Sequence, residues 1–238
     1  MIEGIDISHW ETVTDWPAVK QSGVRFVYLK ASQGERSVDR CFHKYRQACQ
    51  IVGLPWGAYH FYDYRLYAAS QARHFIATVG RTPAEMRGML PPVVDLEPFT
   101  VWQDGKRRQV ELPARLPLFN SLQTLLGHLR DAFGGALLYT NPAMLKRLAP
   151  LPDWLLGVPL WIAHYTPARR PCIGAYPQWL FWQYSDNGTV PGIQGAVDRD
   201  RFNGDEADLE KMLARQGGVL PRFKRALKPP LLGGSDAQ

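Results

Sequence analysis

Short apolar runs alternate along this chain with segments in which apolar residues recur at helical spacing. Several of the runs are continuous rather than strictly alternating, as expected for strands that are covered on both faces of a sheet. The predicted buried strands are residues 4–8, 24–30, 56–61, 92–97, 136–140, 160–164, 180–184 and 195–198.

Amphipathic helices are expected between the early strands. The longest covers residues 116–133, where an apolar stripe is followed by Gly134-Gly135 as a helix stop. Alternation of strands and helices predicts a parallel sheet, and about eight strands in one domain of this size favour a closed barrel. The other predicted helices are residues 39–52, 66–79, 142–149 and 205–216.

The second half of the chain departs from this alternation. Only a short helix is expected after Thr140, and proline-rich loops join the last strands. The predicted fold class is therefore α/β, an irregular single-domain (β/α) barrel of about eight mostly parallel strands, with some helices missing in the second half.

The end of the chain differs in composition from the rest. Residues 215–238 hold five basic side chains against one acid, which accounts for +4 of the formal net charge of +6. Residues 218–238 are also rich in proline and glycine, so we predict a barrel domain at 1–217 and a basic tail at 218–238. Such a tail suits an anionic partner, such as bacterial wall, nucleic acid or a membrane surface, and equally a purely solubilising role.

Targeting and cysteine patterns narrow the class of protein. No apolar run approaches the length of a membrane span, so stable membrane insertion is not expected. The first residues enter a strand without a basic and an apolar leader, so we expect a protein made without a signal peptide. Cys41 and Cys49 are separated by about 12 Å of helical rise, too far for a disulfide, and Cys172 makes the number of cysteines odd.

Acidic residues at the ends of predicted strands are the candidate catalytic groups. In a parallel barrel the carboxyl ends of the strands converge on one mouth, where active sites lie. Four acids fit this position: Asp6 on the first strand, Asp95 and Glu97 on the fourth, and Asp198 on the last. One such acid alone is more often a cap or an ion-pair partner, whereas four converging acids favour catalysis.

Asp95 and Glu97 are two residues apart on a predicted strand, so their side chains leave the same face. At the end of an apolar run, burial and like-charge proximity are expected to raise one pKa, which keeps one carboxyl protonated beside an ionised partner. Glycosidic cleavage uses such a pair. The spacing along the strand fits both retaining and inverting chemistry.

Aromatic side chains gather at the same strand ends, where rings beside hydrogen-bonding groups suit sugars. Each ring alone is more often a core residue, and only the shared position favours carbohydrate binding. His9 and His60 have no partner at metal-binding spacing and no Gly-rich phosphate loop follows a strand, so neither a metal nor a cofactor is expected. The candidate substrate-binding residues are Tyr59, Tyr62, Tyr139, Trp161, Tyr165, Trp182 and Tyr184.

Eight motifs follow one another along the chain: GIDISHW at 4–10, GVRFVYLKA at 23–31, GAYHF at 57–61, QARHF at 71–75, PVVDLE at 92–97, LWIAHY at 160–165, FWQYS at 181–185 and VD at 197–198. Together they resemble the motifs of the Chalaropsis-type lysozymes, glycoside hydrolase family 25. They occur in the family's order and cover residues 1 to about 205. The ordered set is far more specific than any one motif.

This resemblance implies an irregular (β/α) barrel that hydrolyses the β-1,4 bond between N-acetylmuramic acid and N-acetylglucosamine in bacterial peptidoglycan. It implies that Glu97 is the general acid and that Asp95 stabilises positive charge or orients the substrate's N-acetyl group. It also implies that this acetamido group acts as nucleophile, with net retention. Asp6 and Asp198 match the outer acidic positions. The residues that the resemblance places in sugar subsites are Tyr59, Tyr139, Trp182 and Tyr184.

Two segments depart from the family's pattern. Gln33 stands where an acid is usual, which predicts altered loop or subsite contacts without loss of activity. A basic insert follows Glu97 at residues 103–109 and is expected to lengthen a rim loop. Such a loop would change substrate access or wall affinity.

Two other functions stay open from the sequence. One is a catalytically inactive barrel that binds wall glycan. The other is a chitinase-like hydrolase, although Leu90 and Val93 replace the first two acids of its D-x-x-D-x-D-x-E motif. The expected partner is bacterial peptidoglycan rather than nucleic acid, and the chain is expected to act as a monomer. A wall hydrolase made without a signal peptide suits a phage endolysin or a secreted effector.

Overall fold

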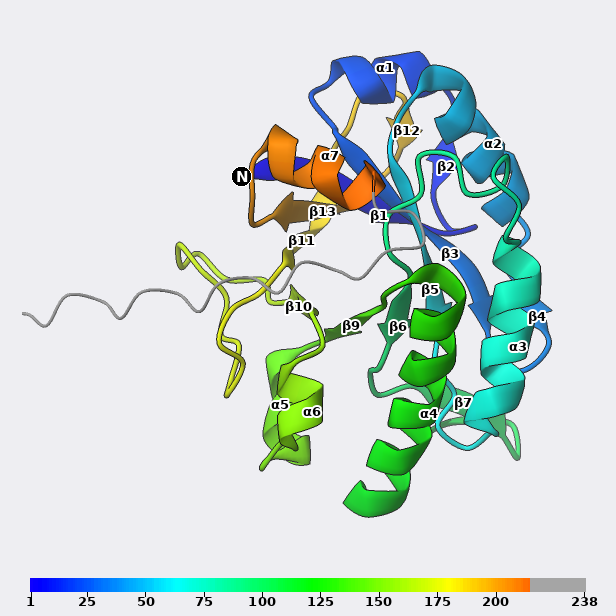
Figure 1. Cartoon of the computed structure of the whole chain (residues 1–238), viewed down its shortest axis with the longest axis vertical. Helices are drawn as coiled ribbons and strands as arrows, with labels where there is room; N and C mark the ends of the chain where they lie inside the picture. The colour runs from blue at the N-terminus through cyan, green and yellow to red at the C-terminus, as the bar shows by residue number, and fades with distance from the viewer. Residues whose placement is uncertain (215–238) are drawn as a thin grey trace, which may run out of the picture.

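The computed structural model describes residues 1–214, so the predicted tail and the last three residues of the predicted barrel domain lie outside it. Eight strands close into a barrel, because β1 pairs with β3 on one side and with β13 on the other (Figure 1). This closure confirms the predicted eight-stranded α/β barrel. In order around the barrel the strands are β1 (Ile2–Ile7), β13 (Val197–Phe202), β11 (Phe181–Gly188), β10 (Leu160–Ala163), β9 (Leu137–Thr140), β6 (Val93–Asp95), β5 (Trp56–Phe61) and β3 (Phe26–Gln33).

Every strand of the barrel runs parallel to its neighbours except β13, which is antiparallel to both β1 and β11. The connection from β11 to β13 is short and carries only β12 (Ile193–Gln194), which pairs with β2 (Thr12–Val13). Parallel neighbours need a longer crossover, so a connection of this length reverses the strand. The short β4 (Ser37–Val38) extends the sheet beyond β3.

Three long helices, α2 (Phe42–Val52), α3 (Ala68–Val79) and α4 (Arg115–Phe133), cover the first half of the barrel (Figure 1). Between β9 and β13 the chain has only α5 (Pro142–Leu148) and α6 (Asp153–Leu156), and no helix separates β10 from β11. The predicted loss of helices on this side is confirmed. No helix within residues 1–214 is long and apolar enough to cross a lipid bilayer.

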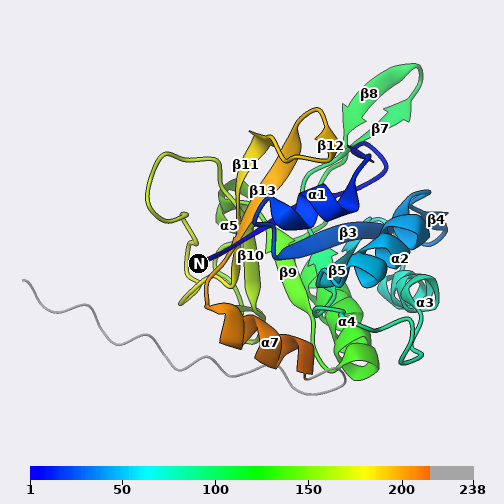
Figure 2. The ribbon, with the colours of Figure 1, turned by 90° about the horizontal axis from the view of Figure 1, so that it is seen from above.

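The amino-terminal end of the barrel is filled by aromatic rings. Tyr28 and Trp161 lie 4.7 Å apart between ring centres, and both belong to a buried cluster that α7 (Glu206–Ala214) covers with Leu209 and Met212. Gly57 is required here, because a Cβ atom would come within 2.1 Å of the Tyr28 ring. Figure 2 shows α7 across this end of the barrel, and the buried rings of the cluster fill the interior beneath it.

The basic insert after Glu97 forms a two-stranded ribbon rather than the loop that was predicted. Its strands are β7 (Thr100–Gln103) and β8 (Lys106–Gln109). Asp104 and Gly105 join them with φ angles of 52° and 70°, the left-handed values that a two-residue hairpin turn needs. Asp-Gly is a strong signal for such a turn, so the ribbon was readable from the sequence.

Candidate active site

All four predicted acids lie at the open mouth of the barrel. Asp6 is near the end of β1, Asp95 is the last residue of β6, and Glu97 follows two residues later. Asp198 pairs directly with Asp6 across the sheet. The sequence interpretation placed Asp198 at the carboxyl end of a parallel strand, whereas it lies near the start of β13. Because β13 is reversed, its start reaches the same mouth.

A pocket of about 100 Å³ opens between these acids. Seven strands of the barrel or the residues that directly follow them contribute to its wall. Three of the predicted aromatic residues line it together with the four acids, so the structure brings most of the predicted site to one place. The lining residues are Asp6, Tyr59, Asp95, Glu97, Tyr139, Trp161, Gln183 and Asp198.

Three predicted aromatic residues lie away from this pocket. Tyr62 is fully buried, and its hydroxyl donates a hydrogen bond of 2.6 Å to α4. Trp182 and Tyr184 flank Gln183 on β11 and therefore point to the opposite face of the sheet. There the Trp182 Nε1 donates to a backbone carbonyl at 2.9 Å, and the Tyr184 hydroxyl donates to Glu3 Oε2 at 2.7 Å. These side chains stabilise the outer layer of the barrel.

Asp95 is buried and the neighbouring Glu97 is half-buried, so the two form a partly buried pair of acids. Burial raises the pKa of Asp95 well above its ordinary value, and the neighbouring Glu97 raises it further. Burial also raises the pKa of Glu97, while the charge of Lys30 lowers it. The pair therefore keeps a shared proton to a higher pH than exposed carboxyls do.

Lys30 is the cation beside this pair. Its Nζ lies 4.8 Å from the centre of the Phe61 ring and donates to Gln33 Oε1 at 3.2 Å. Because Gln33 is neutral, it orients the ammonium group without cancelling its charge. The departure at Gln33 thus changes a contact in the immediate surroundings of Asp95 and Glu97.

A second group of carboxyls lies on β1 and β13. Asp200 is fully buried, and its Oδ1 accepts a hydrogen bond of 2.9 Å from Trp161 Nε1, while its Oδ2 has no donor within residues 1–214. The carboxyl of Asp200 lies near that of Asp6, and each affects the pKa of the other. Burial, and then the charges of Asp200 and Asp198, raise the pKa of Asp6 well above its ordinary value. Burial raises the pKa of Asp198 to about 7.

Gln183 joins these acids to two tyrosines. Its buried amide nitrogen donates to Asp6 Oδ2 at 2.7 Å and to Asp198 Oδ2 at 3.1 Å. Its carbonyl oxygen accepts from the hydroxyls of Tyr139 at 2.9 Å and Tyr165 at 2.7 Å. Both donors and both acceptor positions of the amide are used, which fixes its orientation. Tyr165, a predicted substrate-binding residue, is therefore connected to the pocket through Gln183.

Gln183 and Asp200 were not among the predicted site residues. The signal for Asp200 was present, because it stands two residues from Asp198 on one strand, as Glu97 does from Asp95. Strand alternation also carried part of the signal for Gln183, since it places Gln183 on the opposite face of β11 from Trp182 and Tyr184.

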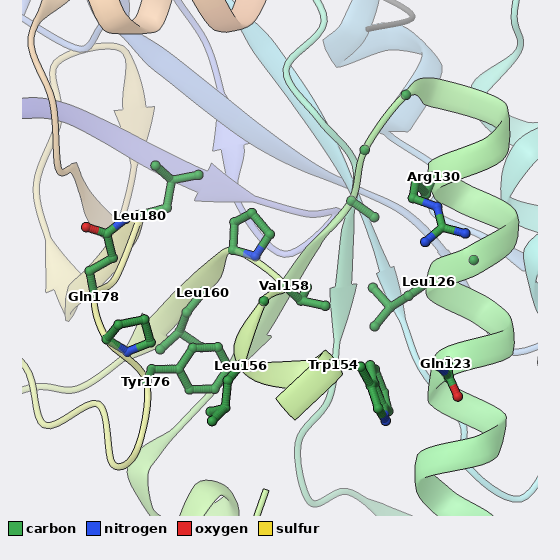
Figure 3. A pocket seen from close by; sticks show the side chains of 17 residues that line it. Gln123, Leu126, Arg130, Trp154, Leu156, Val158, Leu160, Tyr176, Gln178 and Leu180 are labelled. Carbon is green, nitrogen blue, oxygen red and sulfur yellow. The ribbon is translucent and has the colours of Figure 1, made fainter. Parts of the chain in front are cut away.

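A larger cavity of about 760 Å³ lies at the amino-terminal end of the strands, between α4, α6 and the segment before β11 (Figure 3). Its wall includes Trp154, Tyr176 and Arg130 but no Asp or Glu. Without a carboxyl it offers no proton donor for glycosidic cleavage, so the acidic pocket is the candidate active site. Across residues 1–214 no group of His, Cys, Asp or Glu is arranged to hold a metal ion.

Comparison with known proteins agrees with this geometry. The chain matches the description "Glycosyl hydrolases family 25" over residues 5–193. YegX of Escherichia coli O157:H7, described as uncharacterized, is 35% identical over 216 residues, which cover 88% of this chain and 72% of YegX. Lysozyme M1 of Streptomyces globisporus is 27% identical, over 87% of this chain and 70% of that protein. A bacterial lysozyme from Streptomyces coelicolor superposes with a TM-score of 0.76 and 28% identity, over 90% of this chain and 95% of the other. The chain therefore belongs to glycosyl hydrolase family 25 and is a glycoside hydrolase.

Proposed function

We propose that this glycoside hydrolase acts on bacterial peptidoglycan and cleaves the β-1,4 bond between N-acetylmuramic acid and N-acetylglucosamine. The observation that carries the proposal is the pair Asp95 and Glu97, two acids of raised pKa in one pocket lined by tyrosines. Glycosidic cleavage needs one carboxyl that donates a proton and a second that assists at the sugar ring. The relatives named lysozyme support the same substrate.

Glu97 is assigned as the general acid. It is the less buried member of the pair and lies beyond the end of β6, where a bound glycosidic oxygen can reach it. A raised pKa lets it carry a proton at the pH where it must donate one. The proton goes to the leaving oxygen as the bond to the anomeric carbon breaks.

Asp95 is assigned as the assisting acid. It is buried, lines the pocket, and its Oδ1 has no hydrogen-bond donor within residues 1–214. In the proposed mechanism it holds the N–H of the substrate's acetamido group, so that the acetamido oxygen can attack the anomeric carbon. Water then opens this cyclic intermediate, with Glu97 as base and net retention of configuration.

Substitution of Glu97 by glutamine tests the assignment. We expect Glu97→Gln to fold normally and to release muropeptides roughly 100-fold more slowly or worse, because general acid catalysis contributes about 10²–10⁴-fold. The measurement is mass spectrometry of muropeptides released from defined peptidoglycan, which also identifies the sugar at the new reducing end. Glu210→Gln, an exposed acid on α7, is the matched control and should keep its activity.

Three results would contradict parts of this proposal. Near-native turnover by Glu97→Gln would remove its assigned role. Products that end in N-acetylglucosamine would show that a different bond is cleaved. Binding to sacculi with no released product, even from the unsubstituted chain, would favour the inactive glycan-binding barrel instead.

A further inference from the structure

The ribbon of β7 and β8 is firmly rooted at the rim of the pocket and exposed beyond its root. At the root, Val110 N donates to the Phe99 carbonyl at 2.9 Å, and the Tyr64 hydroxyl donates to the Val110 carbonyl at 3.1 Å. The Phe99 ring packs 4.8 Å from the Tyr64 ring. Figure 2 shows the ribbon projecting from the end of the barrel opposite α7. It is therefore an arm with a fixed base, not part of the core.

One face of this arm carries an exposed aromatic platform. Trp102 pairs across the ribbon with Arg107, and the guanidinium lies 5.9 Å from the centre of the indole ring. Trp102 is 72% exposed, so its indole adds little to the folding of the barrel. The other face carries Val101, which is half-buried against the core. The arm thus packs Val101 against the core and exposes the indole of Trp102 to solvent.

Three consecutive cations follow the turn of the arm. Arg108 pairs with Asp104 at 3.2 Å, but both side chains are more than half exposed, so this ion pair is weak. For Lys106 and Arg107 no carboxylate within the described part of the chain lies at ion-pair distance. The arm therefore presents Arg107 against the exposed indole, and Lys106 beside the turn on the opposite face of the ribbon.

We propose that the exposed arm, through Trp102 and Arg107 on one face and Lys106 beside the turn, binds insoluble peptidoglycan next to the pocket. This inference rests on the proposed function. The indole would stack on the apolar face of a sugar ring, and the two cations would pair with carboxylates of the stem peptides that branch from the glycan strand. An arginine that is already stacked on a ring offers its planar N–H groups to a carboxylate at little further entropic cost.

The position of the arm favours the substrate polymer over other anionic surfaces. The arm begins three residues after Glu97, so a strand bound in the pocket passes close to it. A second contact with the same strand raises the local concentration of cleavable bonds at the pocket. Tryptophan beside cations also suits the surface of an anionic lipid bilayer. Binding to such a bilayer is one of the outcomes that the experiment below distinguishes.

The experiment measures binding in a Glu97→Gln background, so that cleavage does not remove the ligand. The triple variant Trp102→Ala, Lys106→Ala, Arg107→Ala is compared with its parent. The matched control is Ile51→Ala, Arg81→Ala, Arg87→Ala, which removes one exposed apolar side chain and two exposed cations far from the pocket. The probes are purified sacculi stripped of covalently attached anionic polymers, unstripped sacculi, and phosphatidylglycerol vesicles.

We expect the triple variant to bind stripped sacculi at least about tenfold more weakly than its parent at low salt, since charge-assisted contacts are lost. Added salt should weaken the parent more than the triple variant, because screening acts on the two cations. The control should bind as the parent does. If the triple variant does not fold, the charge reversal Lys106→Glu, Arg107→Glu, with an intact indole, should show the same loss.

Equal binding of parent and variant to stripped sacculi would overturn the proposal. So would a loss confined to unstripped sacculi, which would assign the arm to an attached polymer, or a loss confined to vesicles, which would assign it to lipid. These results are independent of cleavage. Failure of the unsubstituted chain to release muropeptides would refute the proposed function and leave the binding comparison intact.

Discussion

Gln183 holds the carboxyls and hydroxyls of the pocket in one arrangement through four hydrogen bonds of 2.7–3.1 Å. Its neighbours on one side are the acceptors Asp6 and Asp198, and on the other the donors Tyr139 and Tyr165. Only a primary amide offers two donors and an acceptor oxygen on one planar group. The residue type at position 183 is thus set by its four partners, all of which come from other strands or loops.

Gln183→Glu removes the two donors and keeps the size and the acceptor oxygen. The hydrogen bond from Gln183 lowers the pKa of Asp6, so its loss, together with a new negative charge, should raise the pKa of Asp6 and of Asp198. We expect the rate of peptidoglycan hydrolysis to fall about tenfold or more, because the groups that Gln183 holds would be displaced. The acidic limb of the pH profile should move to higher pH.

The pH dependence of hydrolysis checks this expectation. Gln47→Glu, at an exposed position of α2, adds the same charge without touching the pocket and should leave the profile in place. A profile of Gln183→Glu that overlies that of the unsubstituted protein would show that Gln183 has no positioning role.

For the strands and helices, the sequence predicted which elements exist better than it predicted the direction of each strand. The predicted strand at 195–198 exists as β13, but its direction depends on how short its connection to β11 is. The ribbon β7–β8 was taken for a loop because its polar strands carry no apolar pattern, even though Asp104-Gly105 signals the turn. The helices α1 (Trp16–Gln21) and α6 were not predicted, since four to six residues are too few to show helical periodicity.

Helix α5 offers a test of local sequence signals. Asn141 precedes its first turn, and the Asn141 side chain accepts a hydrogen bond of 2.9 Å from Met144 N. Loss of this cap in Asn141→Ala should lower the free energy of unfolding by about 1 kcal/mol. For a domain of this size we expect the thermal midpoint to fall by about 2–4 °C, measured by circular dichroism. Asn141→Asp keeps an acceptor and should stay near the original midpoint. Equal midpoints for both variants would show that the cap adds nothing.

For the whole molecule, the buried acids of the site lower the free energy of unfolding at neutral pH. Burial raises the pKa of Asp6, Asp95 and Asp200 well above the values of an unfolded chain. The folded protein therefore holds protons that the unfolded chain releases once the pH exceeds about 4. Stability from these groups is present at low pH and is lost as the pH rises through their folded pKa values.

Asp200→Asn should make the protein more stable at neutral pH. Asparagine keeps an acceptor oxygen for Trp161 Nε1. Its amide nitrogen replaces Asp200 Oδ2, which has no hydrogen-bond partner within residues 1–214, and offers Asp6 a donor. Removing a buried unsatisfied group is worth about 1–3 kcal/mol. We expect a thermal midpoint several degrees higher at pH 7 and the same as that of the unsubstituted protein below about pH 4. A gain that is independent of pH would refute the electrostatic cause.

The sequence by itself determined the strands of the barrel, its three long helices and the two acids Asp95 and Glu97. These features depend on periodicity and on spacing within one element, which the local chain carries in full. Only the tertiary structure decided that β13 is reversed, that Trp182 and Tyr184 face outward, and that Asp200 and Gln183 meet Asp6 inside the barrel. Their positions depend on which strands pair and in which register, and that choice is made by closure of the whole sheet.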